Sequence, residues 1–495
     1  MNFHFISYLK MTLITQESKH ELLSKKLDIF KIYLDYSLME HKQYQYEGVK
    51  WCLNNELFNS PCEGVNGGII ADEMGLGKTI MMIGTFITNI LPKTLIVLPV
   101  VLLDQWYNQI LKTTGHKAII YHGKNKKIYD LKQLQHPSIR IVIATYHAIS
   151  ITRNETNNIL HQLKWDRLVF DEAHHLRNKN TSVFKGCQLL NGKIRWLISG
   201  TPIQNKKDDF YNLCACIKIP NEFYKKPTNL LTIAKHFILK RSKKQVGINL
   251  PNINIKHKII NWSHSPEMKL AKEIHSSLHL FERMQGEPYQ KNTEMLSTMM
   301  HAKKICAIPN MISVYDLHKM IKNGIITNNI QQHTKALNYS SKLDAVVKTI
   351  IERKNNGNGK LIFCQFHKEI DTIYNKLIEG GITRIATFDG RTPCYNRMNV
   401  LSQDNEALII QIQSGCEGLN LQDKFNEIYF VSPHWNPSVE DQSIGRCHRI
   451  GQTKSVSVYK FEMEGLNFIS LDDYINNIQE QKRNITQNLF TSNTN

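Results

Sequence analysis

The sequence predicts an α/β protein with two lobes, each built on a parallel β-sheet that helices cover on both faces. Two series of short, continuously apolar segments support this fold class, because strands buried on both faces lack the alternation of a half-exposed strand. Helical stretches alternate with these segments, as expected for α/β lobes. The first series lies at 67–72, 94–99, 139–145, 166–173 and 195–201, and the second at 360–366, 382–390, 407–413, 427–433 and 456–463.

Residues 205–340 separate the two series, lack strand signals and are predicted to be mainly helical. A chain of 495 residues is also too long for one ordinary core. The predicted parts are an N-terminal extension (1–37), a first lobe (38–250), a helical insert or linker (251–339), a second lobe (340–465) and a C-terminal helix with a frayed tail (466–495).

The composition favours a polyanionic partner. The 62 Lys and Arg residues exceed the 43 Asp and Glu residues, which gives a net charge of +19. Such a balance is typical of proteins that bind nucleic acid, although a generally lysine-rich composition explains it equally well.

The cysteines and the apolar segments bound the compartment. The ten cysteines form no C-x-x-C pair, so neither a zinc site nor a disulfide framework is expected, and a reducing intracellular compartment is indicated. The longest strongly apolar segment, 94–103, is too short to span a bilayer. Lys10 and His4 interrupt the apolar N-terminal stretch, which therefore lacks the layout of a signal peptide.

The first apolar segment runs directly into a glycine loop in GGIIADEMGLGKT, and a helix is expected to follow. A strand, a glycine loop, a Lys-Thr pair and a helix form the context of a phosphate-binding P-loop. Gly75 and Gly77 would let backbone N–H groups approach the phosphates of ATP at the positive end of the helix dipole. Lys78 would reach the β- and γ-phosphates, and Thr79 would ligate Mg²⁺. A chance glycine turn beside a lysine is the alternative interpretation.

A second acidic motif, LVFDEAHHLRN, follows a later predicted strand. Asp171 at the strand end would hold Mg²⁺, and Glu172 would orient and deprotonate the attacking water. Acidic residues in this position also cap helices, but the upstream P-loop favours the catalytic interpretation.

These two motifs, DEMGLGKT and DEAHHLRN, resemble motifs I and II of the Swi/Snf-type ATPases in helicase superfamily two. That family carries an aspartate at the position of Asp72, where the general P-loop pattern has its first glycine. Other segments resemble further motifs in the family's order. They are 44–51 (Q motif), 94–106 (motif Ia), 141–149, 197–205 (motif III), 237–251, 340–343, 389–397, 414–421 and 434–452.

The resemblance implies two RecA-like lobes, ATP and Mg²⁺ as cofactors, and a set of nucleotide-binding residues. Gln45 is placed to read adenine. The residues expected at the nucleotide are Gln45, Asp72, Glu73, Met74, Gly75, Leu76, Gly77, Lys78, Thr79, Asp171, Ala173, His174 and Gln442.

The second lobe supplies two candidate arginine fingers. Arg446 and Arg449 follow Gln442 with Q-x-x-x-R-x-x-R spacing, and arginines three residues apart share one face of a helix. By resemblance, both are expected to point across the cleft at the γ-phosphate, where such an arginine is worth ~10³–10⁵ in rate. Surface ion pairing is the alternative. This lobe departs from the usual family pattern at Cys416, Glu417, Ser432, His434 and Gly445.

The function implied is that of a DNA-dependent ATPase that translocates on duplex DNA and remodels nucleoprotein in transcription regulation. The expected partners are double-stranded DNA, bare or nucleosomal, and transcription machinery, without zinc or membrane. The basic runs 122–127 and 240–244 are either phosphate contacts or solvated loops. The chain resembles the compact, motor-only global transactivators of insect baculoviruses, which implies the nucleus, of a host cell if viral. A strand-separating RNA or DNA helicase and a non-catalytic DNA-binding co-regulator remain alternatives.

Overall fold

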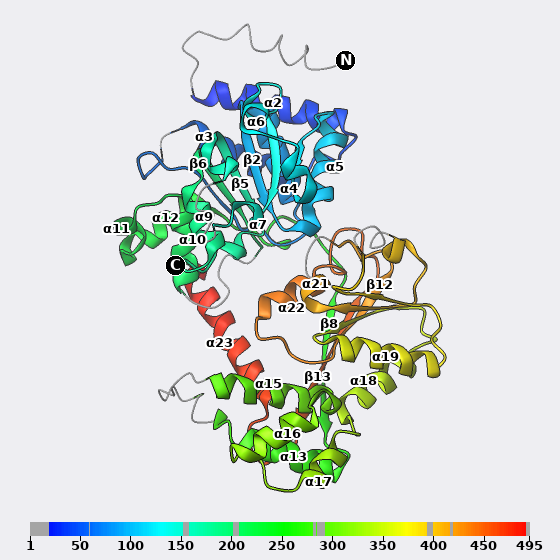
Figure 1. Cartoon of the computed structure of the whole chain (residues 1–495). Coiled ribbons are helices and arrows are strands. Elements are labelled where there is room, and N and C mark those ends of the chain that lie inside the picture. Colours follow the sequence, from blue (N-terminus) through cyan, green and yellow to red (C-terminus); the bar gives the residue numbers. More distant parts are fainter. Residues whose placement is uncertain are drawn as a thin grey trace. The chain divides into compact units, whose positions relative to one another are not determined.

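The computed structural model describes residues 19–58, 60–151, 158–200, 207–280, 284, 293–393, 399–415 and 419–491. The described residues up to Asn249 form one compact unit, and those from Leu250 to Asn484 form a second (Figure 1). Each unit contains one sheet with parallel strand pairs, so the predicted α/β class with two parallel-sheet lobes is confirmed.

The sheet of the first unit has seven strands in the order β3-β4-β2-β5-β6-β1-β7. Its central strands β2 and β5 are buried on both faces, which explains their uninterrupted apolar sequences. Hydrophobic clusters lie on both sides of this sheet. The strands are β1 (Asn66–Ile70), β2 (Thr94–Leu98), β3 (Ile119–Tyr121), β4 (Ile141–Thr145), β5 (Lys164–Asp171), β6 (Asn191–Ile198) and β7 (Ile238–Leu239).

Helices surround this sheet, and the first of them belongs to its core. Phe30 of α2 is fully buried, and Gly84 of α4 lies so close that an added Cβ would stand 2.4 Å from its ring. Helix α2, which the sequence places in an N-terminal extension, therefore packs into the first unit. The helices are α2 (Lys19–Tyr36), α3 (Gln43–Leu57), α4 (Lys78–Thr88), α5 (Leu103–Thr114), α6 (Leu131–Gln135), α7 (Tyr146–Ile149), α8 (Ile159–Gln162), α9 (Ser182–Leu189), α10 (Lys207–Cys216), α11 (Asn221–Tyr224) and α12 (Leu230–Phe237), with 3₁₀ turns η1 (Val100–Leu102), η2 (Gly123–Lys127), η3 (Ala173–Leu176) and η4 (Pro227–Asn229).

The sheet of the second unit has six strands in the order β10-β11-β9-β12-β13-β8. The prediction that 205–340 lacks strands is wrong, because β8 pairs with β13 along its whole length. As an edge strand with mostly exposed side chains, β8 depends on backbone hydrogen bonds and needs no continuous apolar sequence. The strands are β8 (Ile253–Asn261), β9 (Gly359–Cys364), β10 (Ile385–Phe388), β11 (Ala407–Gln411), β12 (Phe425–Phe430) and β13 (Val456–Glu464).

The rest of the predicted insert is helical. Figure 1 shows α13, α15, α16 and α17 gathered in one group, and a shared hydrophobic cluster joins them to α23. The helices that begin in this unit are α13 (Ser265–Ser276), α15 (Thr293–Ala307), α16 (Val314–Lys322), α17 (Ile330–Ala336), α18 (Ser341–Ile351), α19 (His367–Glu379), α21 (Ile412–Gly415), α22 (Pro437–Ile444) and α23 (Leu471–Thr491), with the 3₁₀ turn η5 (Pro309–Met311).

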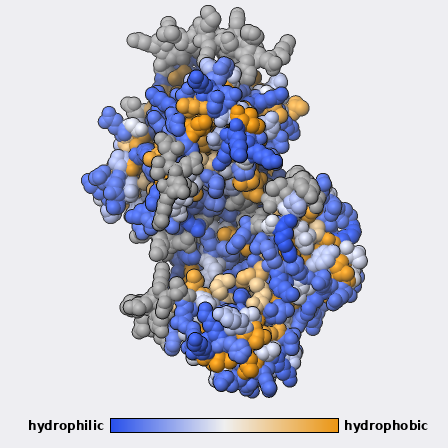
Figure 2. Space-filling model, viewed as in Figure 1, coloured by the Kyte–Doolittle hydropathy of each residue, from blue (hydrophilic) through white to orange (hydrophobic). Residues whose placement is uncertain are grey.

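The face of the molecule drawn in Figure 2 is mainly hydrophilic where the structure describes it. On the face drawn in Figure 2, hydrophobic residues form small, separate groups. Among the helices that the structure describes, none combines the length and the apolar character needed to cross a bilayer.

Candidate active site

The two candidate motifs meet at one edge of the first sheet. Strands β1 and β5 are parallel and both flank β6, so their carboxyl ends lie at the same edge. The glycine loop follows β1, and Asp171 is the last residue of β5. Ligands of open α/β sheets bind at this edge.

Two left-handed glycines shape the loop. Gly75 has φ 90° and Gly77 has φ 76°, a region that other residues rarely adopt, and Gly77 is the N-cap of α4. Lys78 begins that helix, and its Nζ donates to the main-chain oxygens of Asp72 at 2.8 Å and Glu73 at 3.4 Å. The lysine therefore lies across the loop, where a phosphate would meet both its charge and the helix N-terminus.

Gln45 and Gly200 border the same loop. Nε2 of the buried Gln45 donates to the main-chain oxygen of Leu76 at 3.4 Å. A Cβ added at Gly200 would lie 3.1 Å from Cγ of Met74 and 3.8 Å from Nζ of Lys78. The predicted Q motif and the described part of motif III are thus brought to the P-loop, while residues 201–205 lie outside the described residues.

Asp72 holds an arginine that the sequence interpretation missed. Its buried carboxylate accepts from Nε of Arg241 at 3.1 Å, from Nη2 at 2.6 Å and from the Arg241 backbone N–H at 2.9 Å. Nη1 of Arg241 donates to the main-chain oxygen of Tyr44 at 2.6 Å. The Asp72 carboxylate therefore ties the loop to Arg241, and its oxygens are used in that ion pair and not for nucleotide binding.

Glu73 repeats this arrangement with the next basic residue. It accepts the backbone N–H of Lys243 at 2.8 Å and pairs with its Nζ at 3.1 Å. The prediction that 240–244 forms phosphate contacts or a solvated loop is wrong for Arg241 and Lys243, because both are held by the acidic pair of the P-loop. The sequence signal that could have predicted these ion pairs is the presence of two acidic residues in the loop and of a basic run later in the chain.

The acidic motif ends β5 with a strained turn. Asp171 accepts from Nε1 of Trp106 at 2.7 Å and from the backbone N–H of Glu172 at 2.9 Å. Burial and the neighbouring Glu172 raise the pKa of Asp171 to about 7. Glu172 has φ 50° and ψ 49°, a left-handed conformation that is uncommon outside glycine and concentrates at functional sites. Its carboxylate lies 3.3 Å from Nδ1 of His174.

The available donors suit a magnesium ion that arrives with a nucleotide. In the part of the chain described, no group of three or more His, Cys, Asp or Glu side chains is placed to hold a metal alone. Mg²⁺ usually takes one or two carboxylates together with substrate phosphates. The Asp171 carboxylate and the half-buried Thr79 hydroxyl, on the first turn of α4, fit that pattern. Ala173, the first residue of η3, is fully buried.

The arginine motif differs from the prediction. Helix α22 contains the buried Gln442 but ends at Ile444, so Arg446 and Arg449 lie in the following turns and do not share a helix face. Gly445 ends the helix, and the Arg446 backbone N–H turns to the oxygen of Ser443 at 3.2 Å.

Arg446 and Arg449 both form hydrogen bonds with nearby residues of the second unit. Arg446 is 6% exposed, and its main-chain oxygen accepts from Leu421 at 3.1 Å. Arg449 donates to Asn420. Burial and the charge of Arg446 lower the pKa of Arg449. A contact with the γ-phosphate stays a prediction, and Cys416, Glu417 and the end of the 389–397 segment lie outside the described residues.

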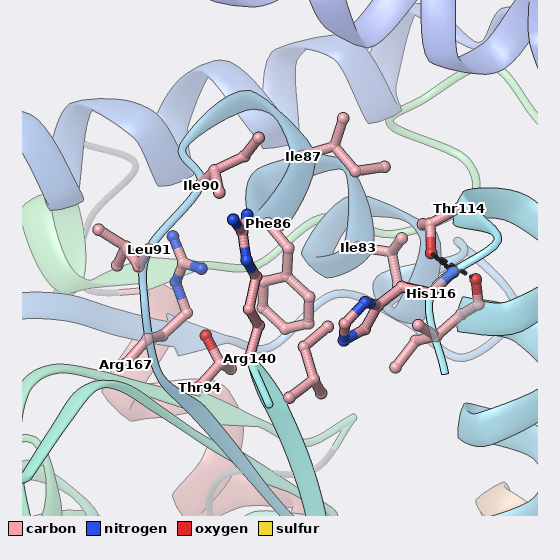
Figure 3. Close-up of a pocket in the computed structure, with 12 residues that line it drawn as sticks. Ile83, Phe86, Ile87, Ile90, Leu91, Thr94, Thr114, His116, Arg140 and Arg167 are labelled. Carbon is pink, nitrogen blue, oxygen red and sulfur yellow. Dashed lines mark hydrogen bonds between the residues drawn. The ribbon is translucent and has the colours of Figure 1, made fainter. Parts of the chain in front are cut away.

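A small pocket of about 80 Å³ lies at the opposite edge of the sheet, beside Thr94 and Ile141, the first residues of β2 and β4. Figure 3 shows Arg140 and Arg167 beside the ring of Phe86, and the Arg167 guanidinium carbon lies 5.0 Å from the ring centre. This pocket is separate from the P-loop edge.

Comparison with known proteins decides the family. Residues 44–311, more than half of the chain, match the SNF2-related domain. The chain belongs to the SNF2 family. Residues 341–451 of this SNF2 chain also match the helicase conserved C-terminal domain.

Several relatives cover most of this SNF2 chain. An uncharacterized ATP-dependent helicase of Mycoplasma genitalium is 27% identical, over 92% of the chain and 42% of the relative. The human chromodomain-helicase-DNA-binding protein 7 is 27% identical, over 85% and 15%. The ATP-dependent DNA helicase DDM1 of Arabidopsis thaliana is 26% identical, over 85% and 58%. The chain thus spans only part of the length of these relatives.

One solved structure is similar over most of both chains. It is the SWI2/SNF2 ATPase core of Sulfolobus solfataricus in complex with double-stranded DNA, with 24% identity, a TM-score of 0.38, and 92% and 93% of the two chains covered.

Proposed function

We propose that this SNF2-family chain is a DNA-dependent ATPase that couples ATP hydrolysis to translocation on duplex DNA and to remodelling of nucleoprotein in transcription regulation. The observation that carries the proposal is the meeting of Lys78 and the Asp171–Glu172 turn at the carboxyl edge of one sheet. On this proposal, the predicted ATP-binding lobe supplies the residues for phosphate binding, metal binding and base catalysis.

Each residue has a role that its position supports. Lys78 and the N–H groups at the start of α4 bind the phosphates, and Thr79 and Asp171 hold the metal. When bound there, Mg²⁺ would supply positive charge that neutralises the transferred phosphoryl group. Glu172 orients the attacking water and takes its proton, in a conformation that keeps its carboxylate beside His174.

Two further roles follow from the family. We propose that Gln45 recognises adenine and that Gln442, Arg446 and Arg449 sense the γ-phosphate from the second lobe. Closure that depends on nucleotide state would then drive stepping along DNA.

DNA as the partner is supported by charge and by the relatives. The net charge is +19, and Lys124 and Lys127 in η2 are exposed. The human relative is named as a DNA-binding protein. A nuclear location is proposed from the DNA substrate alone. The relatives are not used to support it, because one of them comes from Mycoplasma genitalium.

Steady-state ATP hydrolysis tests the proposal. Wild type, Glu172→Gln and the control Glu222→Gln, an exposed residue of α11, are compared without nucleic acid, with duplex DNA and with single-stranded RNA. Stimulation by duplex DNA in wild type and control, lost in Glu172→Gln, is expected. Preferential stimulation by RNA would favour a strand-separating helicase. No hydrolysis under any condition would favour a DNA-binding co-regulator.

A further inference from the structure

The pocket beside the first residues of β2 and β4 has no role in the proposed function. It is partly open to solvent and has a volume of about 80 Å³. Much of its wall is apolar and comes from Phe86 and five isoleucines, Ile83, Ile87, Ile90, Ile110 and Ile141. For comparison, a dry apolar cavity of about 150 Å³ holds one benzene molecule. The pocket therefore has room for a chain of about three or four carbon atoms.

Two arginines and a histidine also line this pocket. Figure 3 shows Arg140 and Arg167 on one side of the Phe86 ring, and His116 on the other side. Arg167 is 1% exposed, and its guanidinium carbon lies 5.0 Å from the centre of that ring. Among the described lining residues that Figure 3 draws, none is acidic. The pocket thus combines an apolar wall with positive charge, which suits an anion that carries an apolar tail.

Arg140 supplies the positive charge that a ligand would meet. The charge of Arg167 is balanced, since its Nε and Nη2 donate to the Glu56 carboxylate at 2.6 and 2.5 Å. Burial, and then the charge of Arg140, lower the pKa of His116. His116 is therefore neutral at pH 7, while the charge of Arg140 acts within the pocket. One guanidinium balances the single charge of a carboxylate and matches the spacing of its two oxygens.

We propose that this pocket binds short aliphatic carboxylates, with the carboxylate at Arg140 and the alkyl chain among the five isoleucines of the wall. Recognition has two parts, because the guanidinium fixes the charged end and the apolar wall selects the length of the tail. Each methylene that enters the pocket raises the affinity about fourfold, until the pocket is full. The ligand class is therefore defined by one negative charge and a tail of about four carbon atoms.

The pocket adjoins both elements that carry the candidate catalytic motifs. Helix α4, which begins at Lys78, contributes Ile83 and Phe86 to the wall. Strand β5, which ends at Asp171, contributes Arg167. The pocket lies at the edge of the sheet opposite to the P-loop, so competition between the carboxylate and ATP is not expected.

The test is a titration of the full chain followed by nuclear magnetic resonance, and it needs no ATPase assay. Isoleucine δ1 methyl groups are labelled with ¹³C, and propionate, butyrate, pentanoate, hexanoate and octanoate are added at constant ionic strength. The five wall isoleucines should shift, with affinity rising about fourfold per methylene as far as pentanoate and then levelling off. Ile409, buried in the second unit, is the control residue and should not shift. Absence of saturable shifts at the wall isoleucines would overturn the proposal.

The role of charge is tested with an uncharged ligand and with matched variants. 1-Pentanol has the chain length of pentanoate and should bind the wild type about tenfold more weakly. Arg140→Met should weaken pentanoate binding about tenfold and leave 1-pentanol binding unchanged. Lys117→Met removes an exposed positive charge next to His116 and is the matched control, which should bind pentanoate like the wild type. Equal affinity of wild type and Arg140→Met for pentanoate would contradict a carboxylate at Arg140.

The place of the tail is tested by filling the pocket. Ile87→Phe adds volume at a half-buried position of the wall and should abolish the methyl shifts at the other four isoleucines. Circular dichroism verifies folding of each variant. If Ile87→Phe does not fold, the length series on the wild type still decides the matter, because an affinity that does not depend on chain length would contradict burial of the tail.

Discussion

Asp72 and Arg241 form a buried ion pair at the base of the P-loop, with contacts of 2.6 and 3.1 Å between residues separated by 169 positions in the sequence. The pair joins the loop after β1 to the segment after β7, next to Tyr44 of α3. It explains why an aspartate stands where a general P-loop has glycine. The aspartate fastens the loop to the rest of the lobe.

Arg241→Met is predicted to destabilise the first unit by roughly 3–5 kcal/mol, because it leaves the Asp72 carboxylate buried without a partner. Denaturant unfolding followed by circular dichroism measures the change. Lys244→Met is the matched control, since Lys244 is exposed in the same segment. Equal stability of both variants would show that the pair does not hold the loop.

Lys78→Ala is predicted to reduce ATP turnover by at least about 100-fold, because the positive charge that faces the phosphates is lost. Lys185→Ala, an exposed lysine of α9, serves as control and should retain wild-type turnover. Substantial DNA-stimulated hydrolysis by Lys78→Ala would refute the P-loop assignment.

Glu56→Ala is predicted to cost roughly 3–5 kcal/mol in the free energy of unfolding, because it leaves Arg167 as a buried cation. The Glu56 carboxylate accepts from Nε of Arg167 at 2.6 Å, Nη2 at 2.5 Å, Nε1 of Trp196 at 2.8 Å and Nδ2 of Asn89 at 2.7 Å.

Urea unfolding measures this loss, and Glu47→Ala is its control because Glu47 is exposed on the same helix, α3. A Glu56→Ala midpoint that matches the control would mean that the buried network adds no stability.

Acid sensitivity of the second unit is predicted from His275. Burial lowers the pKa of His275 to about 4, while its Nδ1 donates to the main-chain oxygen of Ala271 at 2.7 Å and its Nε2 lies 3.5 Å from Sγ of Cys306. Below about pH 6.5 the unfolded chain takes up a proton that the folded one does not, so stability falls as pH falls, by up to about 3 kcal/mol near pH 4.

His275→Gln should flatten this part of the pH profile, whereas His318→Gln, at an exposed position of α16, should not. Thermal unfolding at pH 7.5 and pH 5 measures the effect. A wild-type profile that runs parallel to that of His275→Gln would exclude His275 as the source.

The glycine loop and the acidic motif were predictable because the residues of each are contiguous and follow a strand that is largely apolar. The strand β8 was not, because an edge strand with exposed side chains carries no continuous apolar signal. The helical continuation through Arg446 and Arg449 was wrong for a local reason, since Gly445 ends α22 and the next backbone groups turn to other partners.

The sequence by itself determined the two-lobed α/β class, the P-loop and the strand that leads into Asp171 and Glu172, because these depend on the order of neighbouring residues. The tertiary structure decided which distant groups become partners. Arg241 reaches Asp72, and Arg167 reaches Glu56, only after the sheet has brought β1, β5, β7 and their helices together. Burial then makes each unpaired charge costly, and that cost, which no local pattern records, selects the partners.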